Sequence, residues 1–143
     1  MEYINVRSLI SVDELADRLG DEHLRIFDTA VMFKKVDHGL VANSSIETYR
    51  EAHIPGAAFA DVLGDWSNKE TPYRNVLSID ALQGKLGEIG INEKSEVVVY
   101  SSTMLMWATR AWWCLRYAGV DKVRILNGLS LIHISEPTRL AWI

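Results

Sequence analysis

Runs of apolar, strand-forming residues recur along the chain and predict a series of short strands. The run at 96–100 is almost wholly apolar and β-branched, which is typical of a strand buried on both faces. The run at 24–27 alternates and ends in Asp28, where the chain is expected to turn. The expected strands are 24–27, 57–60, 96–100 and 122–126.

Apolar residues at helical spacing predict three helices between these strands. Ser11 and Glu14 have the spacing of a capping box, and Ser78 precedes a second apolar stripe at positions three to four residues apart. The expected helices begin after Ser11, after Ser78 and near Met106, and end before Gly20, Gly90 and Gly119. Residues 29–50 and 61–77 are polar and rich in turn-forming residues, so we expect long irregular connections there.

Strands that alternate with helices predict an α/β fold, a small parallel sheet flanked by helices on both faces. In such folds ligands bind beyond the carboxyl ends of the strands, where loops lead into helix N-termini. The loop from Tyr100 to Trp107 follows the most apolar strand and opens the most apolar helix. It is therefore the expected place for chemistry.

Composition and charge exclude some classes of function but do not identify one. The chain has 143 residues, of which 48% are hydrophobic, which suits one domain with a real core. A net charge of −4 gives no basic excess for a nucleic-acid partner. Cys114 is the only cysteine, so no intrachain disulfide is possible, and the apolar stretch at 104–118 is too short to span a membrane. We expect a cytoplasmic protein without a signal peptide.

Three segments together resemble the rhodanese homology domain. They are Tyr49-Arg-Glu-Ala-His-Ile-Pro-Gly-Ala-Ala58, the strand, loop and helix from Val97 to Arg116, and Val123-Arg-Ile-Leu-Asn-Gly128. The first resembles the family's HIPGA signature and the last the start of its LDGG turn. The run WATRAWWCLRYAG is most similar to the N-terminal, non-catalytic domain of tandem thiosulfate and 3-mercaptopyruvate sulfurtransferases. The resemblance covers residues 8–128 and implies the rhodanese fold.

The resemblance also implies a reaction that this domain lacks the means to perform. In the family, a persulfide-carrying cysteine directly follows the central strand, and backbone N–H groups with the next helix dipole stabilise its thiolate. Here Ser101 occupies the nucleophile position, and oxygen carries no persulfide. The rest of the equivalent loop is Ser102, Thr103, Met104, Leu105 and Met106, whereas active loops favour small residues and an arginine. We expect no catalytic residue, no cofactor and no activity from this domain alone.

Other chemistry-bearing side chains receive mostly structural interpretations. Cys114 lies within a helix and is expected to behave as a buried hydrophobic residue. Ser101 lacks the G-x-S-x-G elbow of a hydrolase and is expected to bond the local backbone. His53 either contacts substrate in a neighbouring domain or pins the loop before Pro55. Arg110 and Arg116 are expected to bury their stems and expose their heads, with an interdomain ion pair as the alternative; Arg110 is also a candidate for an interdomain or substrate contact. The histidines share no spacing typical of metal ligands.

Two functions remain open at this point. In the first, the chain is the non-catalytic domain of a sulfurtransferase whose catalytic cysteine lies in a second rhodanese domain, the expected partner. Thiosulfate or 3-mercaptopyruvate would be the sulfur donor and a thiol or cyanide the acceptor. In the second, the chain is a free-standing binding or regulatory module. A phosphatase-like relative of the fold would also need a cysteine in the loop, so Ser101 counts equally against it.

The final residues differ in character from the rest. Leu129 to Arg139 read LSLIHISEPTR, which resembles the translation of a transposase-type library adapter. We therefore expect the rhodanese-like domain to occupy 1–128, truncated at its C-terminal end, and 129–143 to be adapter-derived. Loss of a terminal helix would leave one sheet face uncovered, so we expect residues 1–128 to be marginally stable or aggregation-prone.

Overall fold

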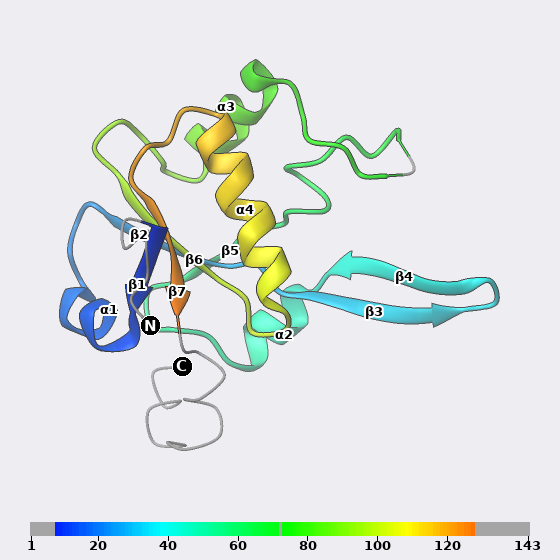
Figure 1. Ribbon diagram of the computed structural model, residues 1–143, viewed down its shortest axis with the longest axis horizontal. Helices are drawn as coiled ribbons and strands as arrows, with labels where there is room; N and C mark the ends of the chain where they lie inside the picture. The colour runs from blue at the N-terminus through cyan, green and yellow to red at the C-terminus, as the bar shows by residue number, and fades with distance from the viewer. Residues whose placement is uncertain (1–7, 72, 128–143) are drawn as a thin grey trace, which may run out of the picture.

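A five-stranded parallel sheet and a separate two-stranded hairpin make up the strand content of the computed structural model, which describes residues 8–71 and 73–127 (Figure 1). The sheet order is β1-β7-β6-β2-β5, and the hairpin joins β3 to β4. In chain order the elements are β1 (Leu9–Ser11), α1 (Val12–Arg18), β2 (Leu24–Asp28), β3 (Val31–Val36), β4 (Gly39–Ser44), α2 (Ile46–Glu51), β5 (Ala58–Phe59), α3 (Ile79–Glu88), β6 (Glu96–Tyr100), α4 (Leu105–Tyr117) and β7 (Val123–Asn127). The expected adapter segment, 129–143, lies outside the described residues.

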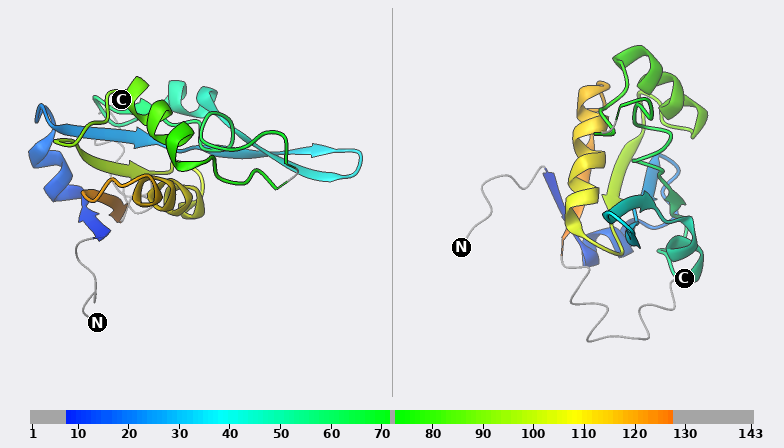
Figure 2. Two further views of the ribbon diagram at one scale, coloured as in Figure 1. Left: turned by 90° about the horizontal axis from the view of Figure 1, so that it is seen from above. Right: turned by 90° about the vertical axis from the view of Figure 1, so that its right-hand side faces the viewer.

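Alternating side chains of the central strand β6 serve two separate cores. Val97 and Val99 join the core beneath α3 and α4, to which Leu82 and Leu115 contribute. Val98 and Tyr100 point to the opposite face and join a smaller core that includes Leu15 of α1. The sheet is thus covered on both faces, as Figure 2 shows, and the expected α/β architecture is confirmed.

The helix boundaries follow the expected capping signals. The Ser11 hydroxyl accepts a hydrogen bond from the Glu14 N–H at 3.1 Å, and the Ser78 hydroxyl accepts one from the Ala81 N–H at 3.3 Å. Gly90 follows α3 with a φ of +88°, a conformation that glycine adopts without strain. These contacts confirm the helices expected after Ser11 and after Ser78.

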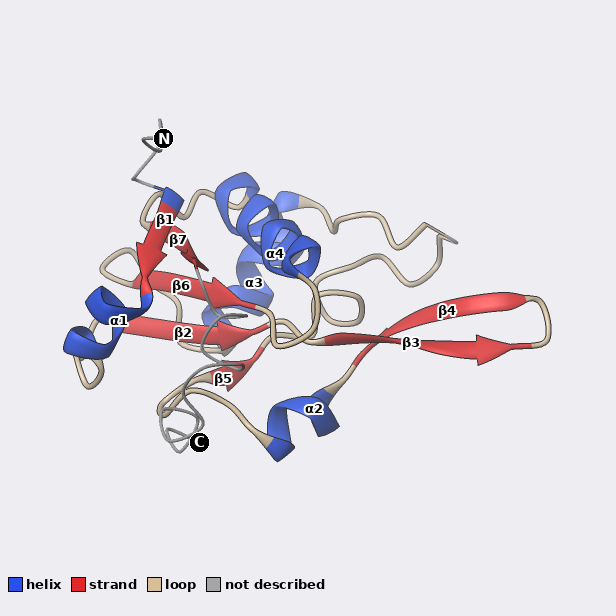
Figure 3. Cartoon of the chain, turned by 60° about the horizontal axis from the view of Figure 1, so that its bottom comes forward, coloured by secondary structure: helices blue, strands red, loops and turns tan. Residues whose placement is uncertain are grey.

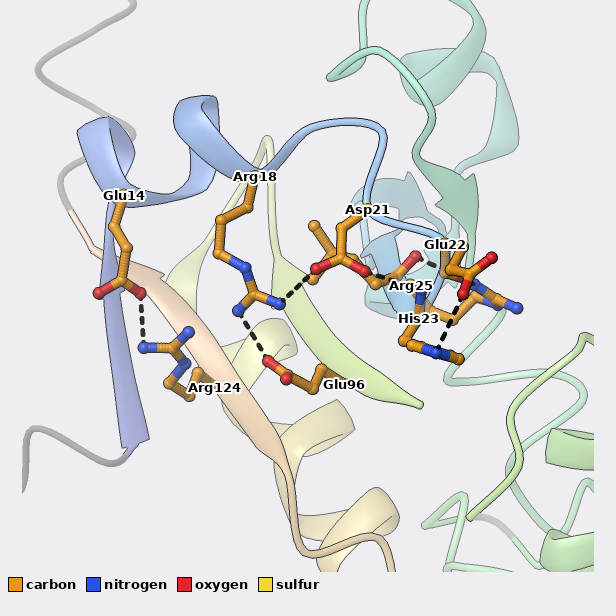
Figure 4. A network of polar contacts seen from close by, with 9 residues as sticks. Glu14, Arg18, Asp21, Glu22, His23, Arg25, Glu96 and Arg124 are labelled. Carbon is orange, nitrogen blue, oxygen red and sulfur yellow. Dashed lines mark hydrogen bonds and ion pairs between the residues drawn. The ribbon is translucent and has the colours of Figure 1, made fainter. Parts of the chain in front are cut away.

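Ion pairs join α1 to the strands β6 and β7, at the opposite end of the sheet from the expected site (Figure 4). Arg18 donates to Glu96 of β6 at 2.7 Å and to Asp21 at 3.0 Å. Glu14 pairs with Arg124 of β7 at 2.6 Å. Because these side chains are partly exposed, the pairs Arg18–Glu96 and Glu14–Arg124 contribute only about 0–1 kcal/mol each.

The expectation of an irregular connection over 29–50 is wrong. This segment contains the β3–β4 hairpin, closed by a two-residue turn at Asp37 and His38, and the helix α2. The hairpin projects away from the sheet in Figure 1, in the left view of Figure 2 and in Figure 3. From the second residue of β3 onward its side chains are exposed except Ala42 and Ser44, which are half-buried, so the sequence shows no regular burial period. Helix α2 has no buried residue, so its sequence carries no apolar stripe from which a helix could be predicted.

Candidate functional site

Two neighbouring strands end side by side at the expected site. Asp28 ends β2 and pairs in register with Tyr100, which ends β6. Thr29 extends this pairing, because both its N–H and its hydroxyl donate to the Tyr100 carbonyl, at 2.8 and 2.9 Å. The loop 101–104 then leads into α4. The segment after β2 and the loop after β6 are therefore held as one unit at the carboxyl edge of the sheet.

The Asp28 carboxylate is the buried polar centre of this edge. It accepts hydrogen bonds from the Ala30 N–H at 3.0 Å and from the Ser102 hydroxyl at 3.1 Å, with a longer one from the Ser102 N–H at 3.4 Å. The side chain is fully buried. Burial raises the pKa of Asp28 above its ordinary value, and the hydrogen bonds from Ser102 and Ala30 offset this only in part.

The raised pKa of Asp28 leads to a testable pH dependence of stability. An acid whose folded pKa exceeds its unfolded pKa contributes stability that is complete below the unfolded pKa and is lost as pH rises through the folded pKa. Asp28→Asn removes this titration and keeps an oxygen acceptor for Ala30. We therefore expect the variant to gain stability relative to the parent chain as pH rises from about 4 to about 7.

Urea denaturation of both chains across this range measures the effect. Asp65→Asn removes a charge from an exposed side chain and controls for the change in net charge. A stability difference between Asp28→Asn and the parent that stays constant with pH would contradict the assignment.

Ser101 does not present a free hydroxyl to the site. Its oxygen lies 3.1 Å from the Thr103 hydroxyl and accepts a hydrogen bond from the Thr103 N–H at 3.2 Å. The Thr103 hydroxyl in turn accepts from the Val31 N–H at 3.2 Å. The expectation that the Ser101 hydroxyl bonds the local backbone is confirmed, and these contacts fix the loop against the start of the hairpin.

The three bulky residues of the loop lie on its outer side. Met104, Leu105 and Met106 are 46%, 64% and 51% exposed. Met104 is the N-cap of α4 and makes no side-chain hydrogen bond to the helix. The start of α4 is thus surrounded by exposed apolar side chains rather than by polar capping groups.

His53 reaches the same edge from the segment after α2. Its Nδ1 lies 2.7 Å from the Tyr49 carbonyl oxygen, and its ring stacks on the Tyr49 ring with centroids 3.9 Å apart. The next residue, Ile54, donates its N–H to the buried Tyr100 hydroxyl at 3.0 Å. These contacts agree with a histidine that pins the loop before Pro55. His53 is also close enough to Asp28 for a protonated ring to stabilise that carboxylate.

Arg110 points inward, contrary to the expectation of an exposed head. Its Nη2 donates to the Ser67 hydroxyl at 3.0 Å and to the Arg74 carbonyl at 2.5 Å, which ties α4 to the long loop before α3. The physical reason is that this loop brings the Ser67 hydroxyl and the Arg74 carbonyl within hydrogen-bond distance of the Arg110 guanidinium. Arg116 is exposed, as expected, and its guanidinium lies over the Trp112 ring.

Cys114 is buried in α4, as expected, with only 2% of its surface exposed. Burial raises the pKa of its thiol, and the nearby Arg110 guanidinium offsets this in part. A buried thiol with a raised pKa is a poor nucleophile at neutral pH. It belongs to the core between α4 and the sheet rather than to the loop after β6.

The sequence signalled Asp28 only as the end of a strand. Its role as the acceptor for the neighbouring loop depends on the pairing of β2 with β6, which brings together residues 74 positions apart. Within the described ranges, no group of three or more His, Cys, Asp or Glu side chains could hold a metal ion. No helix in that part of the chain is long and apolar enough to cross a membrane.

The parallel sheet, the loop after β6 and the covering helices define a small α/β domain with its candidate site at the carboxyl edge. The sequence model of the rhodanese-like domain family matches residues 11–128, and the chain belongs to this family. Thiosulfate/3-mercaptopyruvate sulfurtransferase 2 of Arabidopsis thaliana is 35% identical over 121 residues, which cover 84% of this chain and 34% of that protein. The 3-mercaptopyruvate sulfurtransferase of Escherichia coli (strain K12) is 32% identical over 120 residues, 83% of this chain and 41% of that protein.

Two solved structures of sulfurtransferases also superpose on this chain. The crystal structure of the 3-mercaptopyruvate sulfotransferase from Escherichia coli superposes with a TM-score of 0.70 at 30% identity, covering 85% of this chain and 45% of that one. A sulfur transferase subunit of yeast mitochondrial complex I superposes with a TM-score of 0.71 at 28% identity, covering 87% of this chain and 40% of that one. The chain thus spans less than half the length of these relatives, which suggests a second domain in the full-length proteins.

Proposed function

We propose that this chain is the non-catalytic rhodanese domain of a sulfurtransferase that carries its catalytic cysteine in a second domain. The complete enzyme would take sulfane sulfur from thiosulfate or 3-mercaptopyruvate. A cysteine thiolate attacks the outer sulfur of thiosulfate, the sulfur–sulfur bond breaks, and sulfite leaves. The resulting persulfide then passes its outer sulfur to cyanide or a thiol, which restores the thiolate.

The position after β6 carries this proposal. A thiolate is required there, and the chain has Ser101, whose hydroxyl is engaged with Thr103. The only thiol, Cys114, is buried in the core with a raised pKa and lies on a different element. The similar proteins are named as thiosulfate or 3-mercaptopyruvate sulfurtransferases, which supports the proposed sulfur transfer. Their greater length supports a second domain.

The same proposal gives the domain a supporting role. Hydrogen bonds of Asp28, Thr29 and Thr103 join the segments of its carboxyl edge to one another. His53 is the side chain of this edge that we propose to contact substrate held by the second domain. One ring nitrogen of His53 is held by the Tyr49 carbonyl, which leaves Nε2 for such a contact. The inward direction of Arg110 argues against an interdomain role for that residue.

A thiosulfate:cyanide assay on the purified chain tests the absence of catalysis. We expect no thiocyanate above the uncatalysed rate, because no persulfide-forming thiol is available at the site. Cys114→Ser should behave identically. Turnover that survives Cys114→Ser would contradict the proposal, and turnover that disappears in this variant would instead assign the sulfur carrier to Cys114.

Sequencing the source gene past the codon for Gly128 with adapter-free long reads tests the second-domain part. The proposal expects the reading frame to continue into another rhodanese domain whose loop begins with cysteine. A frame that closes after one domain would contradict it and favour a free-standing module.

A further inference from the structure

The β3–β4 hairpin, residues 31–44 and here called the arm, is unusually exposed for a strand pair. In the described ranges its two strands pair only with each other. Isolated two-stranded hairpins are marginally stable in water, and each exposed strand edge is a template for another strand. The arm extends well clear of the body in Figures 1 and 3. Within the described residues, the arm is therefore a strand pair available to a partner.

The two edges of the arm differ in charge. The β3 strand carries Lys34 and Lys35, residues of the kind that natural proteins place on edge strands to prevent pairing. The β4 strand, Gly39–Ser44, has six uncharged residues and no proline. Leu40 and Val41 in it are 68% and 39% exposed. The β4 edge is thus open to pairing, whereas the β3 edge is protected.

Apolar surface continues from the arm to the start of α4. The Phe33 ring packs against the Trp107 ring with centroids 6.1 Å apart, and Ala42 packs on the core beside it. Eight large apolar side chains of the arm and the start of α4 are at least 39% exposed: Met32, Phe33, Val36, Leu40, Val41, Met104, Leu105 and Met106. Those of the arm lie on both of its faces, so they do not form one continuous patch. The uncharged edge of β4 is therefore the part of the arm best suited to pairing.

We propose that β4 pairs antiparallel with β4 of a second copy of this chain, which joins two arms into a four-stranded sheet across a two-fold axis. Antiparallel pairing of a strand with its own copy is self-complementary, so one contact closes the dimer. In this arrangement the two β3 strands are outermost, about 14 Å apart at three strand spacings. That separation exceeds the Debye length of about 8 Å at physiological salt, so the four lysines repel weakly. Pairing through β3 would instead place the lysines of the two copies side by side.

Val36 and Val41 allow a matched test of the proposed edge. Both are valines of the arm, both are 39% exposed, and they lie on opposite strands. Val41→Lys places a charge on the proposed interface, and Val36→Lys places the same charge on the outer strand. We expect Val41→Lys to raise the dimer dissociation constant about tenfold or more and Val36→Lys to change it less than about threefold. Val41→Thr keeps a β-branched, uncharged residue and should retain the dimer.

Sedimentation equilibrium of the whole chain from about 1 to about 300 µM is the measurement, because association depends on concentration by mass action. Circular dichroism and thermal unfolding show whether each variant remains folded. A defined monomer–dimer equilibrium that Val41→Lys alone weakens supports the proposal. A monomer at every concentration, aggregation without a defined dimer, or equal weakening by both lysine variants would overturn it. The proposal does not depend on the proposed sulfurtransferase function.

Discussion

Ser101→Cys is expected to create a thiol that reacts with iodoacetamide at least about 100-fold faster than the native thiol. Cys114 is 2% exposed and has a raised pKa, so it reacts only when the fold opens. Position 101 is partly exposed, and its side-chain oxygen accepts a hydrogen bond from the Thr103 N–H at 3.2 Å. A sulfur anion there would gain the same donor and the N-terminus of α4, which stabilises negative charge. Mass spectrometry of the labelled chain identifies the modified residue.

Ser102→Cys is the matched control, because it introduces the same thiol one residue further along the loop. The Ser102 hydroxyl lies 3.1 Å from the Asp28 carboxylate, so a thiolate at this position would face a negative charge. Like charges raise the pKa of a thiol, and the reactivity at pH 7 should be lower than for Ser101→Cys. Equal reactivity of the two variants would show that exposure alone, rather than the electrostatics of the loop, controls the thiol.

A reactive thiol at position 101 is not sufficient for sulfur transfer. The loop has no arginine to bind thiosulfate, and Met104, Leu105 and Met106 surround the start of α4 with apolar surface. We therefore expect Ser101→Cys to remain inactive in the thiosulfate:cyanide assay. Turnover by this variant would show that the loop accepts the anion and that the chain lacks only the nucleophile.

The parts of the fold that the sequence predicted are those with buried, periodic side chains. The continuous apolar run of β6 is typical of a strand buried on both faces, and the apolar stripe of α3 has helical spacing. Both elements occur as expected. The arm carries large apolar residues on both faces, so no period marks it. Its pairing, with Val31 opposite Ser44, depends on a turn at Asp37 and His38 that residue types alone did not indicate.

The candidate site was predictable in position but not in its contacts. The loop after β6 follows from chain order in a parallel sheet, because the carboxyl ends of all strands share one edge. The partners of its side chains come from distant segments: Asp28 for Ser102, and Val31 for Thr103. Arg110 shows the same limit, because an arginine stem on a helix can direct its head outward or inward. Its inward direction matches two acceptors in the preceding long loop, the Ser67 hydroxyl and the Arg74 carbonyl.

Leu115→Ala is expected to lower the free energy of unfolding by about 2–5 kcal/mol. Leu115 is fully buried between α4 and the sheet, so its truncation removes apolar contacts and leaves a cavity. Since small domains are stable by only about 5–15 kcal/mol, this is a large share of the total. Leu105→Ala makes the same chemical change at the start of the same helix, where the side chain is 64% exposed, and should change stability by less than about 0.5 kcal/mol.

Urea denaturation of both variants at one protein concentration separates these two effects through the midpoint at constant slope. The comparison also bears on the site, because the loop 101–104 is held between the end of β6 and the start of α4. If α4 is docked by its stripe of Ala108, Ala111, Cys114 and Leu115, weakening that stripe loosens the loop as well. Combined with Ser101→Cys and, separately, with Ser102→Cys, Leu115→Ala should then reduce the difference in reactivity between the thiols at positions 101 and 102. Small and equal losses for the two leucine variants would mean that α4 is not held on the sheet as described, and that the loop lacks the support on which its chemistry depends.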